Sequence, residues 1–295
     1  MTRVLVLLMC LAASVSAHAL QLTDDRGVTV VFEQSPQRIV SLLPSLTESV
    51  CAMEQCQRLI GVDRYSNYPA SVKALPQLGG GIDPNIEAIV ALKPDVVLVS
   101  SASRASGRLE ALGLKVVALE TKNHADVKRV LQKLGVLLAV PDAQGAERLW
   151  RIIDSSVSAA SQSLSAQAKS TRVYFEVSRG PYAAGESSFI GETLKRLGVK
   201  NVVPAALGPF PKLNPEFVVR ANPDLIMIAD RSMKAMNSRE MPYPGWGSIK
   251  AVRDKRICVF GVMDSDVMVR PGPRMAEAAR LMAGCLEKYA VGSPR

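Results

Sequence analysis

A long amphipathic stretch near the middle of the chain constrains the fold most. Residues 142–169 contain no proline and one glycine, close to the start of the stretch. The apolar residues recur every three or four positions, which places them on one stripe of an α-helix. They are Ala146, Leu149, Ile153, Val157, Ala160, Leu164 and Ala168. A continuous helix of this length would be roughly 40 Å long. It has strand-and-helix regions of similar size on both sides, so we predict one rigid helix, over residues 141–170, that joins two lobes.

The first nineteen residues have the pattern of a secretory signal peptide. Arg3 provides a basic start, residues 4–15 are almost wholly apolar, and Ala17-His18-Ala19 is a small-x-small cleavage site. The apolar run is too short to span a bilayer. A buried N-terminal helix would not explain the Ala-x-Ala ending. We therefore expect a signal peptide over residues 1–19, with cleavage near Ala19 and export of the mature chain.

The charge of the chain does not indicate a nucleic-acid-binding protein. The formal charge is +9 for the whole chain and +8 without the signal peptide, because Arg3 is the one charged residue removed. Lysines and arginines are scattered, with no run of five, which is typical of a solvated surface. The remaining length suits two domains.

Four cysteines remain after the predicted cleavage site: Cys51, Cys56, Cys258 and Cys285. An oxidising compartment permits disulfides, and four thiols allow three pairings. Cys51 with Cys56 is the local option, and Cys258 with Cys285 would join a strand to the last helix, but the spacing leaves the pairing open. The absence of a CxxC motif with nearby histidines favours structural cysteines over a zinc site.

Strand and helix patterns alternate on both sides of the central stretch. This alternation predicts a parallel-sheet α/β lobe over residues 20–140 and another over residues 171–295. The N-terminal lobe begins with a hairpin pattern around residues 24–27. A buried strand from Ile39 then leads into a helix, where Ser45 and Glu48 have the spacing of a capping box.

The two halves contain a repeated motif, in residues 85–98 and 214–227. In each copy a glutamate begins an apolar helix, and an aspartate eight residues later follows a proline and precedes a buried strand. The residues are Glu87 and Asp95 in the first copy, Glu216 and Asp224 in the second. The match predicts a pseudo-symmetric pair of lobes.

Five motifs, in this order, resemble a class of periplasmic binding proteins of ABC importers, whose two lobes are joined by one long helix. They are RIVSLLPSLTE at 38–48, GVDRYSNYP at 61–69, NIEAIVALKPDVV at 85–97, NPEFVVRANPDLI at 214–226 and RPGPR at 270–274. The resemblance covers about residues 36–289. It implies a monomeric receptor that holds cobalamin, a ferric siderophore or haem in a cleft between its lobes. Such receptors deliver the ligand to an inner-membrane ABC permease. The chain is most similar to the cobalamin-binding subfamily.

The resemblance also implies which residues contact the ligand. It places the loop from Tyr65 to Tyr68 on the ligand, Phe210 in a stacking position, and Asp266 and Arg270 at the cleft. Two tryptophans of the cobalamin-binding subfamily have no counterpart here, because their positions fall near Gly81 and Ser100. The choice between a corrinoid, a siderophore and haem therefore stays open.

The residues themselves support an apolar ligand with a broad face. Five aromatic side chains fall in predicted loops, outside the apolar-periodic segments: Tyr65, Tyr68, Tyr182, Phe210 and Trp246. A macrocycle needs such faces, together with a few polar groups at its edge. Packing at the base of a loop is the alternative for each aromatic residue. For Asp266 and Arg270, four residues apart, the alternative is a local ion pair.

Glu87 and Glu216 are predicted to dock on the permease. Each begins a helix, where the helix dipole alone stabilises a carboxylate by about 0.3–1 kcal/mol. The resemblance instead implies that both form salt bridges with arginines of a two-subunit permease. Their recurrence in both halves favours the docking role, because two subunits offer two matching sites.

The sequence does not favour an enzyme or a metal site. It contains no GxSxG, P-loop or GxGxxG motif, and residues 185–188 resemble a nucleophile elbow only superficially. An exported α/β hydrolase, the remaining alternative, would have to use His124, the one histidine of the mature chain. We expect no catalytic residues, no cofactor and no site for a bare metal ion.

Overall fold

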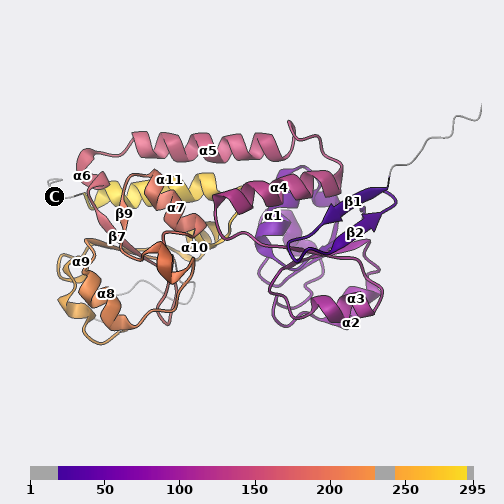
Figure 1. Cartoon of the computed structure of the whole chain (residues 1–295), viewed down its shortest axis with the longest axis horizontal. Helices are drawn as coiled ribbons and strands as arrows, with labels where there is room; N and C mark the ends of the chain where they lie inside the picture. Colours follow the sequence, from indigo (N-terminus) through magenta and orange to yellow (C-terminus); the bar gives the residue numbers. More distant parts are fainter. Residues whose placement is uncertain (1–18, 230–242, 291–295) are drawn as a thin grey trace, which may run out of the picture.

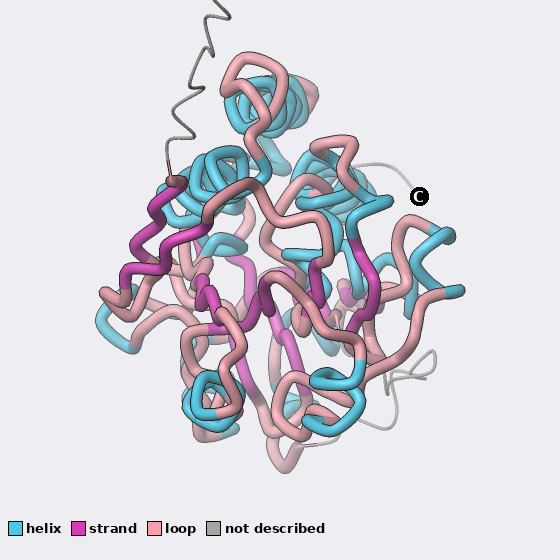
Figure 2. Tube along the Cα trace, turned by 90° about the vertical axis from the view of Figure 1, so that its right-hand side faces the viewer, coloured by secondary structure: helices cyan, strands magenta, loops and turns pink. Residues whose placement is uncertain are grey.

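The computed structural model describes residues 19–229 and 243–290, so the predicted signal peptide lies outside it except for Ala19. Two α/β lobes stand side by side, with a layer of helices along one side of both (Figure 1). A view along the long axis shows strands between helices above and below them (Figure 2). Within the described residues, no helix has both the length and the apolar character needed to cross a membrane.

The N-terminal lobe contains a sheet of four parallel strands in the order β4-β3-β5-β6. They are β3 (Ile39–Ser41), β4 (Leu59–Val62), β5 (Val96–Ser100) and β6 (Val116–Leu119). These are short apolar runs, as parallel strands buried on both faces require. One face packs on α2 (Ile86–Ala91) and α3 (Ser106–Ala111), the other on α1 (Pro44–Ala52) and α4 (His124–Leu138). The predicted hairpin, β1 (Leu20–Thr23) and β2 (Thr29–Phe32), is confirmed.

The C-terminal lobe repeats this topology. Its parallel strands are β7 (Arg172–Ser178), β9 (Lys200–Asn201), β10 (Leu225–Ile228) and β11 (Ile257–Val259), in the order β9-β7-β10-β11. A short strand, β8 (Tyr182–Ala183), runs antiparallel to β7. Its helices are α7 (Phe189–Arg196), α8 (Pro215–Ala221), α9 (Lys250–Arg253), α10 (Val262–Val269) and α11 (Met275–Lys288). When the parallel strands of each lobe are counted in chain order, both sheets have the spatial order second, first, third, fourth. This shared order confirms the predicted pseudo-symmetry.

The repeated sequence motif is also a repeated structural unit. Asn85 caps α2 by accepting from the backbone N–H of Ala88, and Asn214 caps α8 in the same way through Glu216 N–H. An arginine just before β3 and another at the start of β7 donate to carbonyl groups at the C-terminal ends of α2 and α8. Arg38 Nη2 lies 2.7 Å from Leu92 O, and Arg172 Nη2 lies 2.7 Å from Ala221 O. The matching polar contacts hold both glutamate-bearing helices against their sheets in the same orientation.

The central helix is shorter than predicted. The apolar stripe is buried as expected, but α5 covers only Ala146–Gln162, about 25 Å, and a separate turn, α6, covers Ala166–Lys169. The chain leaves the helix because Ser165 caps α6, accepting from Ala168 N–H, while Ser165 N–H and Oγ donate to Glu287 on α11. The prediction of one continuous helix over 141–170 is therefore wrong. α5 packs on α4 and α11 and lies on the opposite side of the molecule from α2 and α8 (Figure 1).

A second connection joins the lobes. After β11 the chain runs through α10 to residues 270–274, which contact α1 of the N-terminal lobe, and α11 then returns to the C-terminal lobe. Gly272 lies against α1, where a Cβ added to this glycine would be 3.5 Å from Ser45 O. One apolar core continues beneath α4, α5, α7 and α11 through both lobes. The lobes are thus joined by more than the single helix predicted from the sequence.

Two disulfides settle the pairing that the sequence left open. Cys51 is bonded to Cys56 at the end of α1, and Cys258 on β11 is bonded to Cys285 on α11. The second bond closes a longer loop and attaches the returning helix α11 to the C-terminal sheet.

Candidate functional site

A cleft of about 630 Å³ lies between the lobes and is lined by both. The N-terminal lobe contributes Leu43, Pro44, Ser45, Tyr65, Ser100, Leu119, Glu120, Thr121 and Lys122. The C-terminal half contributes Val177, Phe189, Ile190, Pro209, Phe210, Asp266, Val269, Arg270 and Pro271. Most of these residues follow the carboxyl ends of strands, where open α/β sheets bind their ligands. The volume is within the range of small-molecule sites.

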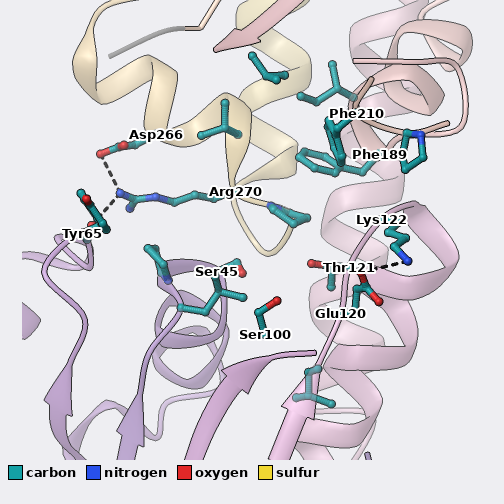
Figure 3. A pocket seen from close by; sticks show the side chains of 18 residues that line it. Ser45, Tyr65, Ser100, Glu120, Thr121, Lys122, Phe189, Phe210, Asp266 and Arg270 are labelled. Carbon is teal, nitrogen blue, oxygen red and sulfur yellow. Dashed lines mark hydrogen bonds and ion pairs between the residues drawn. The ribbon is translucent and has the colours of Figure 1, made fainter. Parts of the chain in front are cut away.

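One wall of the cleft is apolar and aromatic. Phe189, at the start of α7, and Phe210 have ring centroids 5.7 Å apart at an angle of 56°. Figure 3 shows both rings beside the cavity, on the side opposite Tyr65. Phe210 was predicted from the sequence to contact the ligand, but Phe189 was not. Its position directly after a strand-to-helix loop was the available signal. Together the rings offer the broad apolar face that a macrocycle needs.

Arg270 lies at the polar end of the cleft, and both of its terminal nitrogens are engaged with protein atoms. Nη2 lies 2.9 Å from Asp266 Oδ2 and donates to Tyr65 O at 2.9 Å (Figure 3). Nη1 donates to Glu48 Oε1 at 2.7 Å and to Asn67 Oδ1 at 2.8 Å. The local ion pair weighed as an alternative for Asp266 and Arg270 is present, as part of a larger network.

Glu48 has a role that the sequence did not reveal. The structure does not form the predicted capping box, because Leu43 is the N-cap residue, Pro44 begins α1, and Ser45 makes no capping bond. The Glu48 side chain is instead buried and accepts hydrogen bonds from Arg270 and Arg274. Sequence reasoning missed this because its partners are more than two hundred residues away.

The formal charges among the described lining residues cancel. Lys122 Nζ lies 3.1 Å from Glu120 Oε1 at one end of the cleft, and Arg270 pairs with Asp266 at the other. Both cations therefore have a carboxylate partner within the protein. Arg270 and Asp266 are buried, which makes partner exchange costly for that pair, whereas the Lys122 and Glu120 side chains are 53% and 35% exposed. The lining thus offers a polyanion one accessible cation, and it suits a ligand with little net charge better.

Comparison with known proteins identifies the family. Residues 39–261 match the model of the periplasmic binding protein family. The chain belongs to this family. It is 29% identical over 275 residues to the uncharacterized ABC transporter substrate-binding lipoprotein YvrC of Bacillus subtilis, covering 88% of this chain and 83% of the relative. It is 27% identical over 251 residues to the vitamin B12-binding protein of Pectobacterium atrosepticum, covering 83% and 86% of the two chains.

A solved structure supports the same fold. The periplasmic haem-binding protein of Pseudomonas aeruginosa superposes with a TM-score of 0.70 at 26% identity, covering 86% of this chain and 94% of that one. This family member is thus a substrate-binding protein for ABC transport and not an enzyme.

In this periplasmic binding protein, His124, the histidine that the hydrolase alternative would have to use, bonds to α7. His124 Nε2 lies 2.9 Å from Thr193 Oγ1 and 3.1 Å from Phe189 O, both on α7. Ser188 caps α7 by accepting from Gly191 N–H, and Ser187 Oγ is buried with no hydrogen-bond partner in the part of the chain that the structure describes. Of the described residues, neither of these serines is bonded to His124, as a nucleophilic triad would require.

His124 predicts a pH dependence of stability, because it connects α4 to α7 across the lobes. Burial lowers its pKa below the ordinary value of 6.5, with Glu192 opposing and Arg196 adding to the shift. The unfolded chain then binds the proton at a higher pH than the folded one, so the free energy of unfolding decreases as the pH falls below 6.5. We expect thermal denaturation to show this loss between pH 7 and pH 5, and to show much less of it in His124→Gln. Equal losses in both proteins would contradict this role. The carboxyl groups of Asp24 and Asp25, whose pKa values are lowered, change the free energy of unfolding only at lower pH.

Three predicted ligand residues of this binding protein do not line the cleft. Tyr68 lies under the guanidinium of Arg274, 4.4 Å from the ring centroid, and Tyr182 is exposed with Lys212 near its ring. Trp246 is fully buried in the core of the C-terminal lobe, where its Nε1 donates to Pro215 O at 3.2 Å. Trp246 was predicted to contact a ligand from a loop. It instead begins a short 3-10 helix whose indole packs into the core.

The two predicted docking glutamates lie on the surface. The side chains of Glu87 and Glu216 are 79% and 77% exposed. Each has a weak local partner, Arg108 at 3.3 Å and Arg220 at 3.8 Å. The helices that carry them, α2 and α8, lie on the same side of the molecule, away from α5 (Figure 1). Exposed pairs of this kind contribute little to stability, so both carboxylates are available to another molecule.

Proposed function

We propose that this periplasmic binding protein captures a corrinoid such as cobalamin in the cleft and delivers it to an inner-membrane ABC permease. The observation that carries the proposal is the cleft itself, with an aromatic wall and internally balanced charges. A corrin ring presents broad apolar faces and a rim of neutral amides, which match such a lining. The similarity to vitamin B12-binding proteins over most of the chain supports the same ligand class.

Tyr65 and Phe210 are the proposed main contacts, one from each lobe, with Phe189 beside Phe210. Asp266 and Arg270 contribute to the polar end as a pair, and the aliphatic part of Arg270 faces the cavity. Tyr68 and Tyr182 remain proposed contacts only for ligand groups that extend beyond the cleft.

Haem or a ferric siderophore is the second candidate. Tyr65 lines the cleft, and a phenolate oxygen is a ligand for ferric iron. The haem-binding structure from Pseudomonas aeruginosa favours this candidate. Against it, haem propionates or an anionic siderophore would need accessible cations, and of the two described lining cations Arg270 is buried and paired, which leaves only Lys122 with its exposed partner Glu120.

The proposed setting is the periplasm, after removal of residues 1–19, with the protein acting as a monomer. Glu87 and Glu216 are proposed to form salt bridges with the permease. No nucleic acid and no resident cofactor are part of this proposal.

Titration calorimetry of the mature chain with cyanocobalamin, haemin and a ferric hydroxamate tests the ligand. We expect one cyanocobalamin site with a negative heat-capacity change, because apolar surface is buried. Phe210→Ala should weaken binding about tenfold, the effect of roughly 1.4 kcal/mol. Phe217→Ala, which removes a phenylalanine of α8 outside the cleft, is the matched control and should leave affinity unchanged. Binding of haemin with no heat from cyanocobalamin at micromolar protein would replace the corrinoid by the second candidate.

A further inference from the structure

Two motifs far apart in the sequence are bound to each other beside the cleft. One is the loop over residues 65–68 of the N-terminal lobe. The other is the segment 270–274, with Arg270 and Arg274, which reaches this loop from the C-terminal lobe. Arg270 donates to Tyr65 O at 2.9 Å and to Asn67 Oδ1 at 2.8 Å, and Asn67 Nδ2 donates to Asp266 Oδ2 at 2.8 Å. The Arg274 guanidinium covers the ring of Tyr68.

Glu48 orders both arginines. Its Oε1 accepts from Arg270 Nη1 and Arg274 Nη2, both at 2.7 Å, and its Oε2 accepts from Arg274 Nε at 2.8 Å. Glu48, Asp266, Arg270 and Arg274 are all buried, and their two negative and two positive charges balance. Guanidinium–carboxylate pairs of this geometry are directional, so they fix the positions of the groups they join.

Among the described residues, the hydrogen bonds that hold the loop to its own lobe lie in its first half. Asp63 accepts from Tyr65 N–H at 3.0 Å and from the hydroxyl of Ser66, which also bonds to Thr47. Burial raises the pKa of Asp63, while the Ser66 hydroxyl, Tyr65 N–H and Arg270 oppose the rise. Beyond Ser66, the Asn67 side chain bonds to Asp266 and Arg270, and the ring of Tyr68 lies against Arg274, all from the other side of the cleft.

We propose that Glu48, Asn67, Asp266, Arg270 and Arg274 form a loop clamp that positions Tyr65 for ligand contact. In this assignment Arg270 is a positioning residue: its terminal nitrogens hold the backbone and side chains of the loop, and it forms no salt bridge with the ligand. Because the clamp crosses the lobe boundary, the position of Tyr65 depends on the relative position of the lobes. The ligand-contact part of this inference rests on the proposed function; the clamp itself does not.

Asn67→Ala tests the clamp without leaving a buried charge unpaired, because Asp266 and Arg270 keep each other as partners. Hydrogen–deuterium exchange of the ligand-free mature protein reports on the loop through the amides of Tyr65 and Ser66, both bonded to Asp63. We expect exchange over residues 63–69 to accelerate about tenfold in Asn67→Ala. The matched control is Asn201→Ala, which also removes two buried amide hydrogen bonds, to Ala184 O and Val203 N–H, in the C-terminal lobe. It should leave exchange of the loop unchanged.

A double-mutant cycle then tests positioning of Tyr65. With cyanocobalamin as the probe, Asn67→Ala should weaken binding about tenfold in the presence of Tyr65 and less than about twofold in Tyr65→Ala. Equal weakening in both backgrounds would mean that the clamp does not act through Tyr65 and would overturn the inference. Unchanged exchange in Asn67→Ala would overturn it as well. If exchange accelerates but neither cyanocobalamin nor haemin binds, the proposed ligand fails, while the clamp stands as a device that orders the loop.

Discussion

Replacing Glu87 and Glu216 together by lysine should abolish transport and leave ligand affinity unchanged. Both side chains are exposed, on helices that the repeated arginine and asparagine contacts hold in matching orientations. Both helices lie on one side of the molecule (Figure 1). If each carboxylate meets an arginine of the permease, reversal turns two attractions into repulsions between like charges, which cost several kcal/mol in an interface. The cleft is lined by other residues, so binding of the ligand should not change.

Uptake of labelled cobalamin into vesicles that contain the cognate permease measures this effect, with calorimetry of the isolated receptor in parallel. Asp142→Lys with Glu147→Lys is a matched control, since it makes the same change in charge at exposed positions just before α5 and in its first turn, and α5 lies on the opposite side of the molecule. Transport should survive in the control. Transport that also survives in the Glu87 and Glu216 variant would refute the docking role.

Glu48→Ala should lower the free energy of unfolding by about 3–5 kcal/mol. The substitution removes the common acceptor of Arg270 and Arg274, and it leaves a buried positive charge without compensation. It also breaks the contact between α1 and the segment 270–274, so we expect it to change the shape of the cleft as well as the free energy of unfolding.

Urea denaturation of the mature protein measures this loss. Glu87→Ala is the matched control, because it removes the carboxylate of an exposed glutamate–arginine pair on a helix and should cost under about 1 kcal/mol. A loss in Glu48→Ala as small as in this control would show that the network contributes little to the folded state.

Local patterns predicted most of the secondary structure. Buried parallel strands such as β5 and β10 are apolar runs that end at turn residues, and the two glutamate helices begin at asparagine caps. The exposure of Glu87 and Glu216 agrees with the surface role that the family resemblance implied for them. Tyr65, Phe210, Asp266 and Arg270, named from the sequence, do line the cleft; their contact with a ligand remains a proposal.

Other features could not be predicted from local patterns. The helix α10 was not predicted, because its hydrophobic residues do not repeat with a helical period. The break after Gln162 depends on Glu287, more than a hundred residues away, and Trp246 packs into a core formed by Tyr174 and Tyr243.

The amphipathic stretch over residues 142–169 shows what the sequence determined by itself and what only the tertiary structure decided. Periodicity by itself determined which face of residues 146–168 is buried, because side-chain direction in a helix follows from spacing alone. Tertiary structure decided that this face lies on α4 and α11, that the helix stops at Gln162, and that a second crossing, through Arg270, joins the lobes. The sequence alone could not have revealed these features, because a buried charge such as Glu48 is stable only beside partners that folding brings to it.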